Sequence, residues 1–145
     1  MITQQGGFLI TRIKQVGGRV FERILSEKNI DAFNGPQGRI LYVLWQEDGI
    51  PIRQLSRKTG LATTTLTGML DRMEAARLIR RDRGDADRRK VRIFLTAEAK
   101  GLEPEYRAVT EEMSRIYYKG FSSAEVEQFE GYLARVLRNV EDALL

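Results

Sequence analysis

The feature that most constrains the fold of this chain is a short helical pattern, a glycine turn, a longer helical pattern and two strand-like segments, in that order. A short helix is predicted from Pro51 to Lys58 or Thr59, because proline is tolerated at the first helical position. Gly60 suits the positive φ that often follows a helix end. A longer helix is predicted over residues 62–77, where apolar residues recur at spacings of three and four.

The next part of the chain has the pattern of a β-hairpin. Residues 78–83 and 91–95 are strand-like, and residues 84–90 between them are polar and charged. A hairpin directly after a helix-turn-helix is a wing. The sequence therefore predicts a mainly α fold with a small β-hairpin wing, a winged helix-turn-helix flanked by N- and C-terminal helices.

The flanking segments have the patterns of long helices. One helix is expected over residues 8–28, and another follows the break at residues 34–36 and ends near Asp48-Gly49. Heptad-like apolar seams follow over residues 102–116 and 126–140, with Ser122 or Ser123 as a cap for the last helix. Gly101 and Pro104 predict a bend, or a helix that starts near Glu103.

These patterns predict three regions along the chain. Residues 1–34 and 97–145 form a dimerisation region, and residues 35–96 form the DNA-binding domain. The terminal helices are too extended to be buried by so small a domain, so a second copy of the chain is their expected partner.

Composition excludes several kinds of chemistry. The 145 residues include no Cys and no His, which removes disulfides, thiol nucleophiles, imidazole bases and zinc sites built on sulfur or nitrogen. Asp85 and Asp87 are a candidate carboxylate pair, but they fall in an arginine-rich loop without a predicted cleft. We therefore predict no enzyme activity, metal or cofactor. The N-terminus lacks a secretory signal and no apolar run could cross a bilayer, so a cytoplasmic location is expected.

Positive charge is concentrated in the middle of the chain. Residues 53–92 contain twelve basic and five acidic side chains, a net charge of +7, whereas the whole chain carries +4. The two flanks together carry −3, so the positive charge of this segment indicates a polyanionic partner for that segment.

Candidate DNA contacts follow from these patterns. Small hydroxyls at the start of helix 62–77 could reach base edges or phosphates, although Thr63 could instead be an N-cap and the others solvated surface. Basic residues at the hairpin tip could enter the minor groove, with Asp87 orienting a neighbouring arginine, or could form a solvated charged turn. The candidates are Thr63, Thr64, Thr65, Thr67, Gly68 and Arg72 on the helix, Arg83, Asp87, Arg88, Arg89 and Lys90 on the wing, and, as backbone contacts or solubilising surface, Arg53, Arg57 and Lys58.

Residues 54–74 (QLSRKTGLATTTLTGMLDRME), Leu78-Ile79 and residues 85–96 (DADRRKVRIFLT) together resemble the MarR (multiple antibiotic resistance regulator) family. The resemblance implies a homodimer that binds double-stranded DNA at a pseudo-palindromic operator, usually as a repressor. It also implies that Arg89 is the minor-groove residue and Asp87 its orienting partner. Many such regulators release DNA when a small, often aromatic or anionic effector binds. Gly68, Gly101 and Pro104 depart from the family pattern.

Two other functions remain open at this point. A sequence-tolerant architectural DNA binder would show a salt-dependent affinity without preference for one sequence. A winged-helix protein interaction module would lose little function when the wing arginines are removed.

Overall fold

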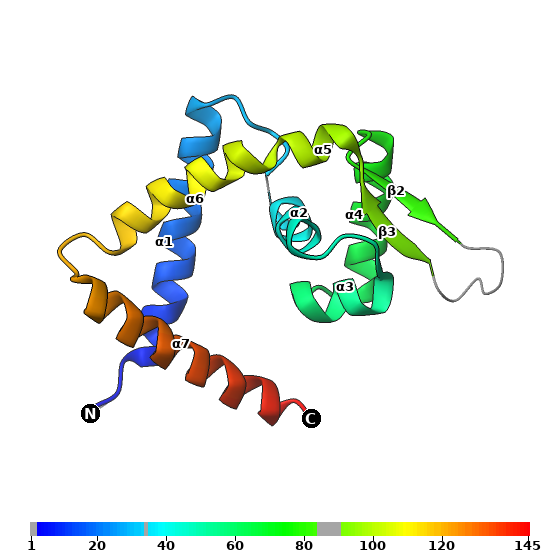
Figure 1. Cartoon of the computed structure of the whole chain (residues 1–145). Coiled ribbons are helices and arrows are strands. Elements are labelled where there is room, and N and C mark those ends of the chain that lie inside the picture. Colours follow the sequence, from blue (N-terminus) through cyan, green and yellow to red (C-terminus); the bar gives the residue numbers. More distant parts are fainter. Residues whose placement is uncertain (1–2, 34, 84–90) are drawn as a thin grey trace. The chain divides into compact units, whose positions relative to one another are not determined.

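A computed structural model describes residues 3–33, 35–83 and 91–145, and it divides the chain into two compact units, residues 1–109 and 110–145. The elements are shown in Figure 1. They are, in chain order, α1 Gly6–Glu27, α2 Pro36–Gln46, β1 Ile50–Pro51, α3 Ile52–Thr59, α4 Thr63–Ala75, β2 Ile79–Asp82, β3 Arg92–Leu95, α5 Ala97–Gly101, α6 Glu103–Tyr117 and α7 Ser123–Ala143.

The first unit contains the predicted winged helix-turn-helix. Strands β2 and β3 pair in antiparallel fashion, with Arg81 opposite Ile93, and they run side by side away from α4 in Figure 1. A third strand, β1, lies on the other edge of β3, so the sheet order is β1-β3-β2. The wing prediction is confirmed, and the third strand was not predicted.

The core of this unit lies between α2, α3, α4 and the sheet. Leu44, Leu55, Leu66, Leu70 and Ile93 are fully buried there, one or two from each element. Their burial fixes which face of α4 turns inward, and the opposite face is left to solvent.

Trp45 and Met69 are half-buried at the edge of this core. Trp45 lies at the edge, where its indole nitrogen donates to the Ala99 carbonyl at 2.9 Å, and Met69 lies at the margin of the buried face of α4.

The starts of two helices differ from the sequence prediction. Pro51 is the extended residue before α3, with φ −65° and ψ 153°, and it pairs with Arg92 in the sheet. The N-cap of α4 is Ala62, so Thr63 is the first helical residue and not the cap. The N-terminal end of α4 therefore lacks a side-chain cap.

The predicted interruption after the wing is confirmed. Helix α5 ends at Gly101 and α6 begins at Glu103. Thr96 caps α5, because its hydroxyl accepts a hydrogen bond from the Ala99 backbone N–H.

The second unit is built around a helix cap and an aromatic cluster. Ser122 caps α7 in a capping box with Glu125, and the hydrogen bond from the Ser122 backbone N–H lowers the pKa of that carboxyl. The rings of Tyr118, Phe121 and Phe129 contact one another edge to face. The pKa of Tyr118 is raised to about 12, mainly by burial and also by its hydrogen bond to Glu130.

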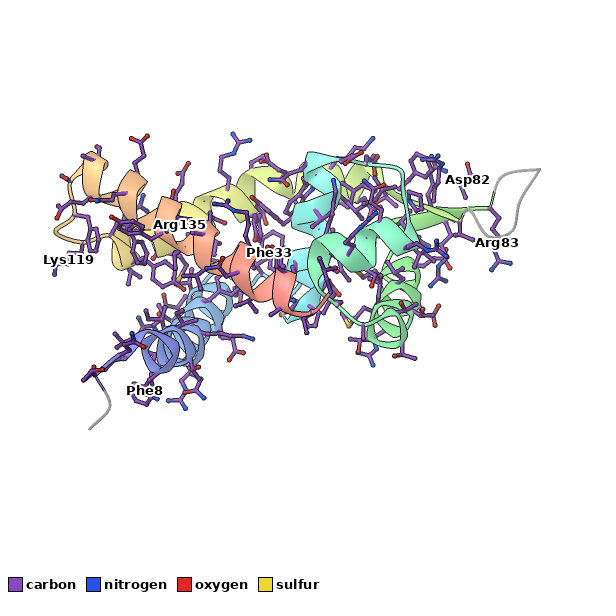
Figure 2. The ribbon with its side chains drawn as sticks, turned by 90° about the horizontal axis from the view of Figure 1, so that it is seen from below. Phe8, Phe33, Asp82, Arg83, Lys119 and Arg135 are labelled. Atoms are coloured by element: carbon purple, nitrogen blue, oxygen red, sulfur yellow. The ribbon has the colours of Figure 1, made fainter. Side chains whose placement is uncertain are left out.

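Long apolar faces remain exposed on α1 and on α7. On α1 they include Phe8, which projects from the helix in Figure 2 and is 67% exposed. The other exposed apolar residues are Leu9, Ile10, Ile13 and Val16 on α1, and Phe129, Tyr132, Leu133, Val136, Leu137 and Val140 on α7. None of the helices in the described part of the chain has the length and apolar character that a membrane span needs.

Candidate nucleic-acid interface

The turn between α3 and α4 is held by short polar contacts. Gly60 has a φ of 73°, the left-handed conformation that a residue with a side chain adopts only at a cost. The buried Thr59 hydroxyl donates to the Leu55 carbonyl at 2.7 Å, and the Ser56 hydroxyl donates to the Leu61 carbonyl at 2.7 Å. These bonds fix the direction in which α4 leaves the turn.

The exposed face of α4 presents the predicted contact residues together. Leu66, Leu70 and Met73 are buried on the inner face. The outer side carries Thr63, Thr64, Thr65, Thr67 and Arg72, all exposed, and Gly68, half-buried.

The hydroxyls on this face differ in availability. Thr67 donates to the Thr63 carbonyl of its own helix at 2.8 Å. Within the described ranges, the hydroxyls of Thr64 and Thr65 have no hydrogen-bond partner in the protein. These two hydroxyls can therefore bond a ligand without breaking a hydrogen bond to any residue that the structure describes.

The basic residues of α3 also differ in availability. Lys58 contacts the Glu47 carboxylate, and the hydrogen bond from Lys58 lowers the pKa of Glu47. Arg53 and Arg57 are exposed, and neither forms an ion pair with any other residue that the structure describes. Of the three residues predicted to contact the DNA backbone, Arg53 and Arg57 therefore have no ion pair among the described residues, and Lys58 has one.

The wing is described only along its strands. Arg83 is exposed just beyond β2, and Figure 2 shows Asp82 and Arg83 pointing to opposite sides of the hairpin. The predicted contacts Asp87, Arg88, Arg89 and Lys90 lie outside the described residues.

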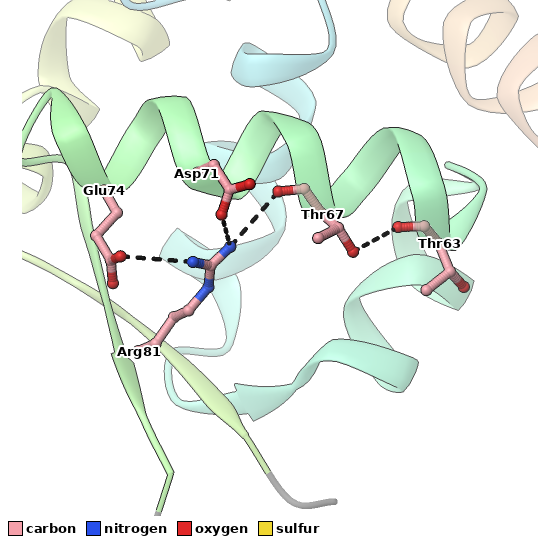
Figure 3. Close-up of polar contacts among 5 residues, drawn as sticks. All are labelled: Thr63, Thr67, Asp71, Glu74 and Arg81. Atoms are coloured by element: carbon pink, nitrogen blue, oxygen red, sulfur yellow. Dashed lines mark hydrogen bonds and ion pairs between the residues drawn. The ribbon is translucent and has the colours of Figure 1, made fainter.

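Arg81 connects the wing to α4, and sequence reasoning missed this contact. Its guanidinium lies 2.8 Å from Asp71 Oδ1 and 3.4 Å from Glu74 Oε1, and it also donates to the Thr67 carbonyl at 3.5 Å (Figure 3). A partial signal was present in the sequence, since Thr67, Asp71 and Glu74 are spaced by four and three on one face of a helix.

A separate cavity of about 230 Å³ lies within the first unit. It is lined by the aromatic residues Phe21, Phe33, Tyr42 and Tyr106, by Arg39, and by Gly35 and Gly38. The Arg39 guanidinium donates to the Thr59 carbonyl at 3.0 Å, so one lining residue also contacts the end of α3. No cluster of metal-ligating side chains is present among the residues that the structure describes.

Comparisons with known sequences identify relatives among bacterial regulators. Residues 33–91 match the sequence model of the MarR family. The regulator TtmR of Methylorubrum extorquens is 36% identical over 86 residues, which cover 59% of this chain and 43% of that protein. The regulator MgrA of Staphylococcus aureus is 28% identical over 126 residues, 86% of this chain and 84% of that one. The chain thus spans under half of TtmR but most of MgrA.

Solved structures share the fold over nearly the whole chain. A putative MarR family regulator from Listeria monocytogenes, solved with a 26mer DNA, has a TM-score of 0.82 at 20% identity and covers 99% of this chain and 92% of its own. NadR in complex with 4-hydroxyphenylacetate has a TM-score of 0.72 at 25% identity, with 94% of this chain and 97% of its own covered. The match over residues 33–91 and the fold shared with these solved structures make this chain similar to the MarR family of transcriptional regulators.

Proposed function

We propose that this protein is a homodimeric, sequence-specific DNA-binding repressor that recognises a pseudo-palindromic operator. The observation that carries the proposal is the exposed N-terminal end of α4, in the basic segment 53–92, where the hydroxyls of Thr64 and Thr65 have no hydrogen-bond partner among the described residues. In winged-helix proteins of this class the corresponding helix enters the major groove with its N-terminal residues toward the base edges.

Each group of candidate residues has a distinct role in this proposal. The helix residues read base edges, with Arg72 and Thr63 at the margins. Arg53 and Arg57 contact phosphates and fix the register of the protein on the duplex. On the wing, Arg89 enters the minor groove and Asp87 orients it, as the family resemblance implies.

The exposed apolar faces of α1 and α7 support dimerisation. Contiguous apolar surface on two long helices is unusual for a monomer and is typical of a protein interface. A two-fold dimer presents two copies of α4, which matches an operator of two inverted half-sites about one helical turn apart. In this proposal residues 1–34 and 97–145 serve dimerisation and residues 35–96 bind DNA.

We further propose that a small aromatic anion relieves repression. The cavity combines four aromatic rings with one guanidinium, a lining suited to an aromatic carboxylate. NadR, which shares the fold, was solved in complex with 4-hydroxyphenylacetate, a ligand of this class. Arg39 also contacts the Thr59 carbonyl at the end of α3, so a carboxylate that attracts this guanidinium would weaken a contact at the turn before α4.

Arg89→Ala tests the DNA-binding proposal. We expect it to weaken operator binding strongly, because it removes the minor-groove arginine, and to leave the dimer and its melting temperature unchanged. Lys119→Ala, which removes one exposed charge outside the basic segment, is the matched control. Binding of Arg89→Ala equal to that of the parent protein would show that the wing assignment is wrong.

The two alternative functions, an architectural DNA binder and a protein interaction module, predict different results in binding experiments. An architectural DNA binder shows log affinity falling with log salt at about −0.9 per neutralised phosphate, with no preference for one sequence. A protein interaction module loses little function when Arg88 and Arg89 are both changed to Ala.

The effector proposal has its own test. We expect 4-hydroxyphenylacetate to weaken operator binding by the parent protein and to have less effect on Arg39→Gln. An equal effect on both proteins, or no effect on the parent, would contradict this part of the proposal.

A further inference from the structure

We propose that Arg81 is a positioning residue for DNA recognition, and that Asp71 and Glu74 of α4, the helix proposed to read the bases, promote operator binding by holding the Arg81 guanidinium in place. The inference rests on the proposed DNA-binding function. In this view the ion pairs set the angle between α4 and the wing, so that both elements meet the duplex together.

The contacts of Arg81 extend along one face of α4. Its Nη2 atom donates to Asp71 Oδ1 at 2.8 Å and to the Thr67 carbonyl at 3.5 Å, while Nη1 donates to Glu74 Oε1 at 3.4 Å (Figure 3). The three acceptors span two turns of helix. A planar guanidinium bound at both ends of its fork resists rotation of the strand against the helix.

The burial of these side chains supports a geometric role. The Arg81 side chain is 15% exposed, whereas Asp71 and Glu74 are 64% and 46% exposed. Solvent screens the two exposed carboxylates, which limits what these ion pairs contribute to the free energy of unfolding. A contact that adds little stability but joins two elements is better explained by what it does to their relative position.

Strand β2 connects Arg81 to the outer part of the wing. Arg81 lies opposite Ile93 in the hairpin, and Arg83, an exposed candidate contact, follows two residues later. A change in the angle of β2 at Arg81 therefore displaces Arg83. If the wing is displaced, α4 and the wing cannot both contact a rigid duplex at the same time.

Substitution of the acidic residues tests the inference, because the competing explanations predict opposite changes in operator affinity. Asp71 is exposed on the helix that carries Thr64 and Thr65, so its charge repels nearby phosphates. If charge alone mattered, Asp71→Asn would tighten DNA binding. If Arg81 contacted DNA directly, releasing it from Asp71 would also tighten binding. Positioning alone predicts that Asp71→Asn weakens operator binding.

The experiment compares full-length Asp71→Asn, Glu74→Gln, Arg81→Lys and Arg81→Ala with the parent protein. Arg80→Ala is the matched control, because it removes one positive charge from the same strand but from the opposite face, where Arg80 stacks on Phe94 at 4.4 Å. Three properties are measured: affinity for an operator selected with the parent protein, affinity for random-sequence DNA, and hydroxyl-radical footprints of the operator complex. Thermal unfolding of each variant confirms that it is folded.

We expect Asp71→Asn to weaken operator binding by about tenfold, comparable to the loss of one specific contact. Its binding to random DNA should be unchanged or tighter, and minor-groove protection at the wing should be lost while the protection centred on the major groove stays. Arg81→Lys should fall between the parent and Arg81→Ala, because an ammonium retains one ion pair. The double variant Asp71→Asn/Arg81→Ala should be no weaker than Arg81→Ala alone.

Tighter operator binding by both Asp71→Asn and Glu74→Gln, with an unchanged footprint, would overturn the inference. Equal losses for Arg80→Ala and Arg81→Ala would overturn it as well, because they would reduce the effect to charge. A parent protein that selects no operator would instead overturn the proposed function, and with it this inference.

Discussion

Arg57 and Lys58 are neighbours on α3, yet they are available to DNA to different degrees. Lys58 contacts Glu47, whereas Arg57 forms no ion pair within the described ranges. On α4, Thr67 donates to its own helix while Thr65 has no partner there. A contact that must first break an internal bond contributes less net free energy to binding. We therefore expect Arg57 and Thr65 to contribute more than their neighbours.

Thr65→Ala tests the readout of bases by a single hydroxyl. We expect it to change the order of preference among operators with single base changes, because a lost base contact affects one position. Thr65→Ser keeps the hydroxyl and should keep the parent preference. Affinities measured for a panel of operator variants decide this. A uniform loss of affinity across the panel would show that Thr65 contacts the backbone instead.

For single residues, the sequence predicts which side chains are exposed better than what they contact. The helical spacing placed the threonines of α4 on the outer face, and they are exposed there. The contacts of Arg81 with Asp71 and Glu74 were missed because they join a strand to a helix, and no periodicity relates them. They depend on the packing of β2 against α4.

Among the helices and strands, regular patterns gave reliable predictions and short ones did not. The helices, the hairpin and the break near Gly101 follow from periodicity and from glycine and proline. Strand β1 has two residues, too few for any alternation, and its place depends on pairing with β3. Its proline was therefore assigned to the following helix. The start of α4 at Thr63 was ambiguous because a threonine can either cap a helix or begin one.

Gly68 of α4 offers a test of helix stability on the recognition face. A Cβ at this position would have no atom within 4 Å, so Gly68→Ala should raise the free energy of unfolding by about 1 kcal/mol through helix propensity. Gly38→Ala is the contrasting variant, because its Cβ would lie 2.7 Å from the Phe33 carbonyl oxygen. Gly38→Ala should be destabilising by about 1–3 kcal/mol, as overpacking usually is.

Urea unfolding of the two glycine variants measures both effects. We predict shifts of the midpoint in opposite directions, with similar slopes. A destabilised Gly68→Ala would mean that the recognition face is packed against something that the single chain does not show.

In the molecule as a whole, each compact unit carries an apolar face that the single chain leaves uncovered. Leu133 and Val136 on α7 are 39% and 43% exposed, and Ile13 on α1 is 49% exposed. The heptad-like spacing on α7 indicated such a face from the sequence. It did not show which surface of the partner covers it, because that depends on the symmetry of the assembly.

Leu133→Glu combined with Val136→Glu tests the dimer. Two charges on this face should shift the protein from dimer to monomer in sedimentation velocity, because burying unpaired carboxylates is costly. Arg138→Glu, an exposed charge change on the same helix, should leave the dimer intact. Operator binding should fall together with dimerisation, since each monomer then binds one half-site. A doubly charged variant that stays dimeric would place the interface elsewhere.

Sequence-specific regulation is best tested by selecting bound fragments from a genomic DNA library at near-physiological salt, with the purified parent protein. We predict enrichment of one inverted repeat whose half-sites lie about one helical turn apart. Binding of many fragments without enrichment of any common sequence would contradict sequence-specific regulation, and no binding in the absence of added ligand would contradict the DNA-binding function itself.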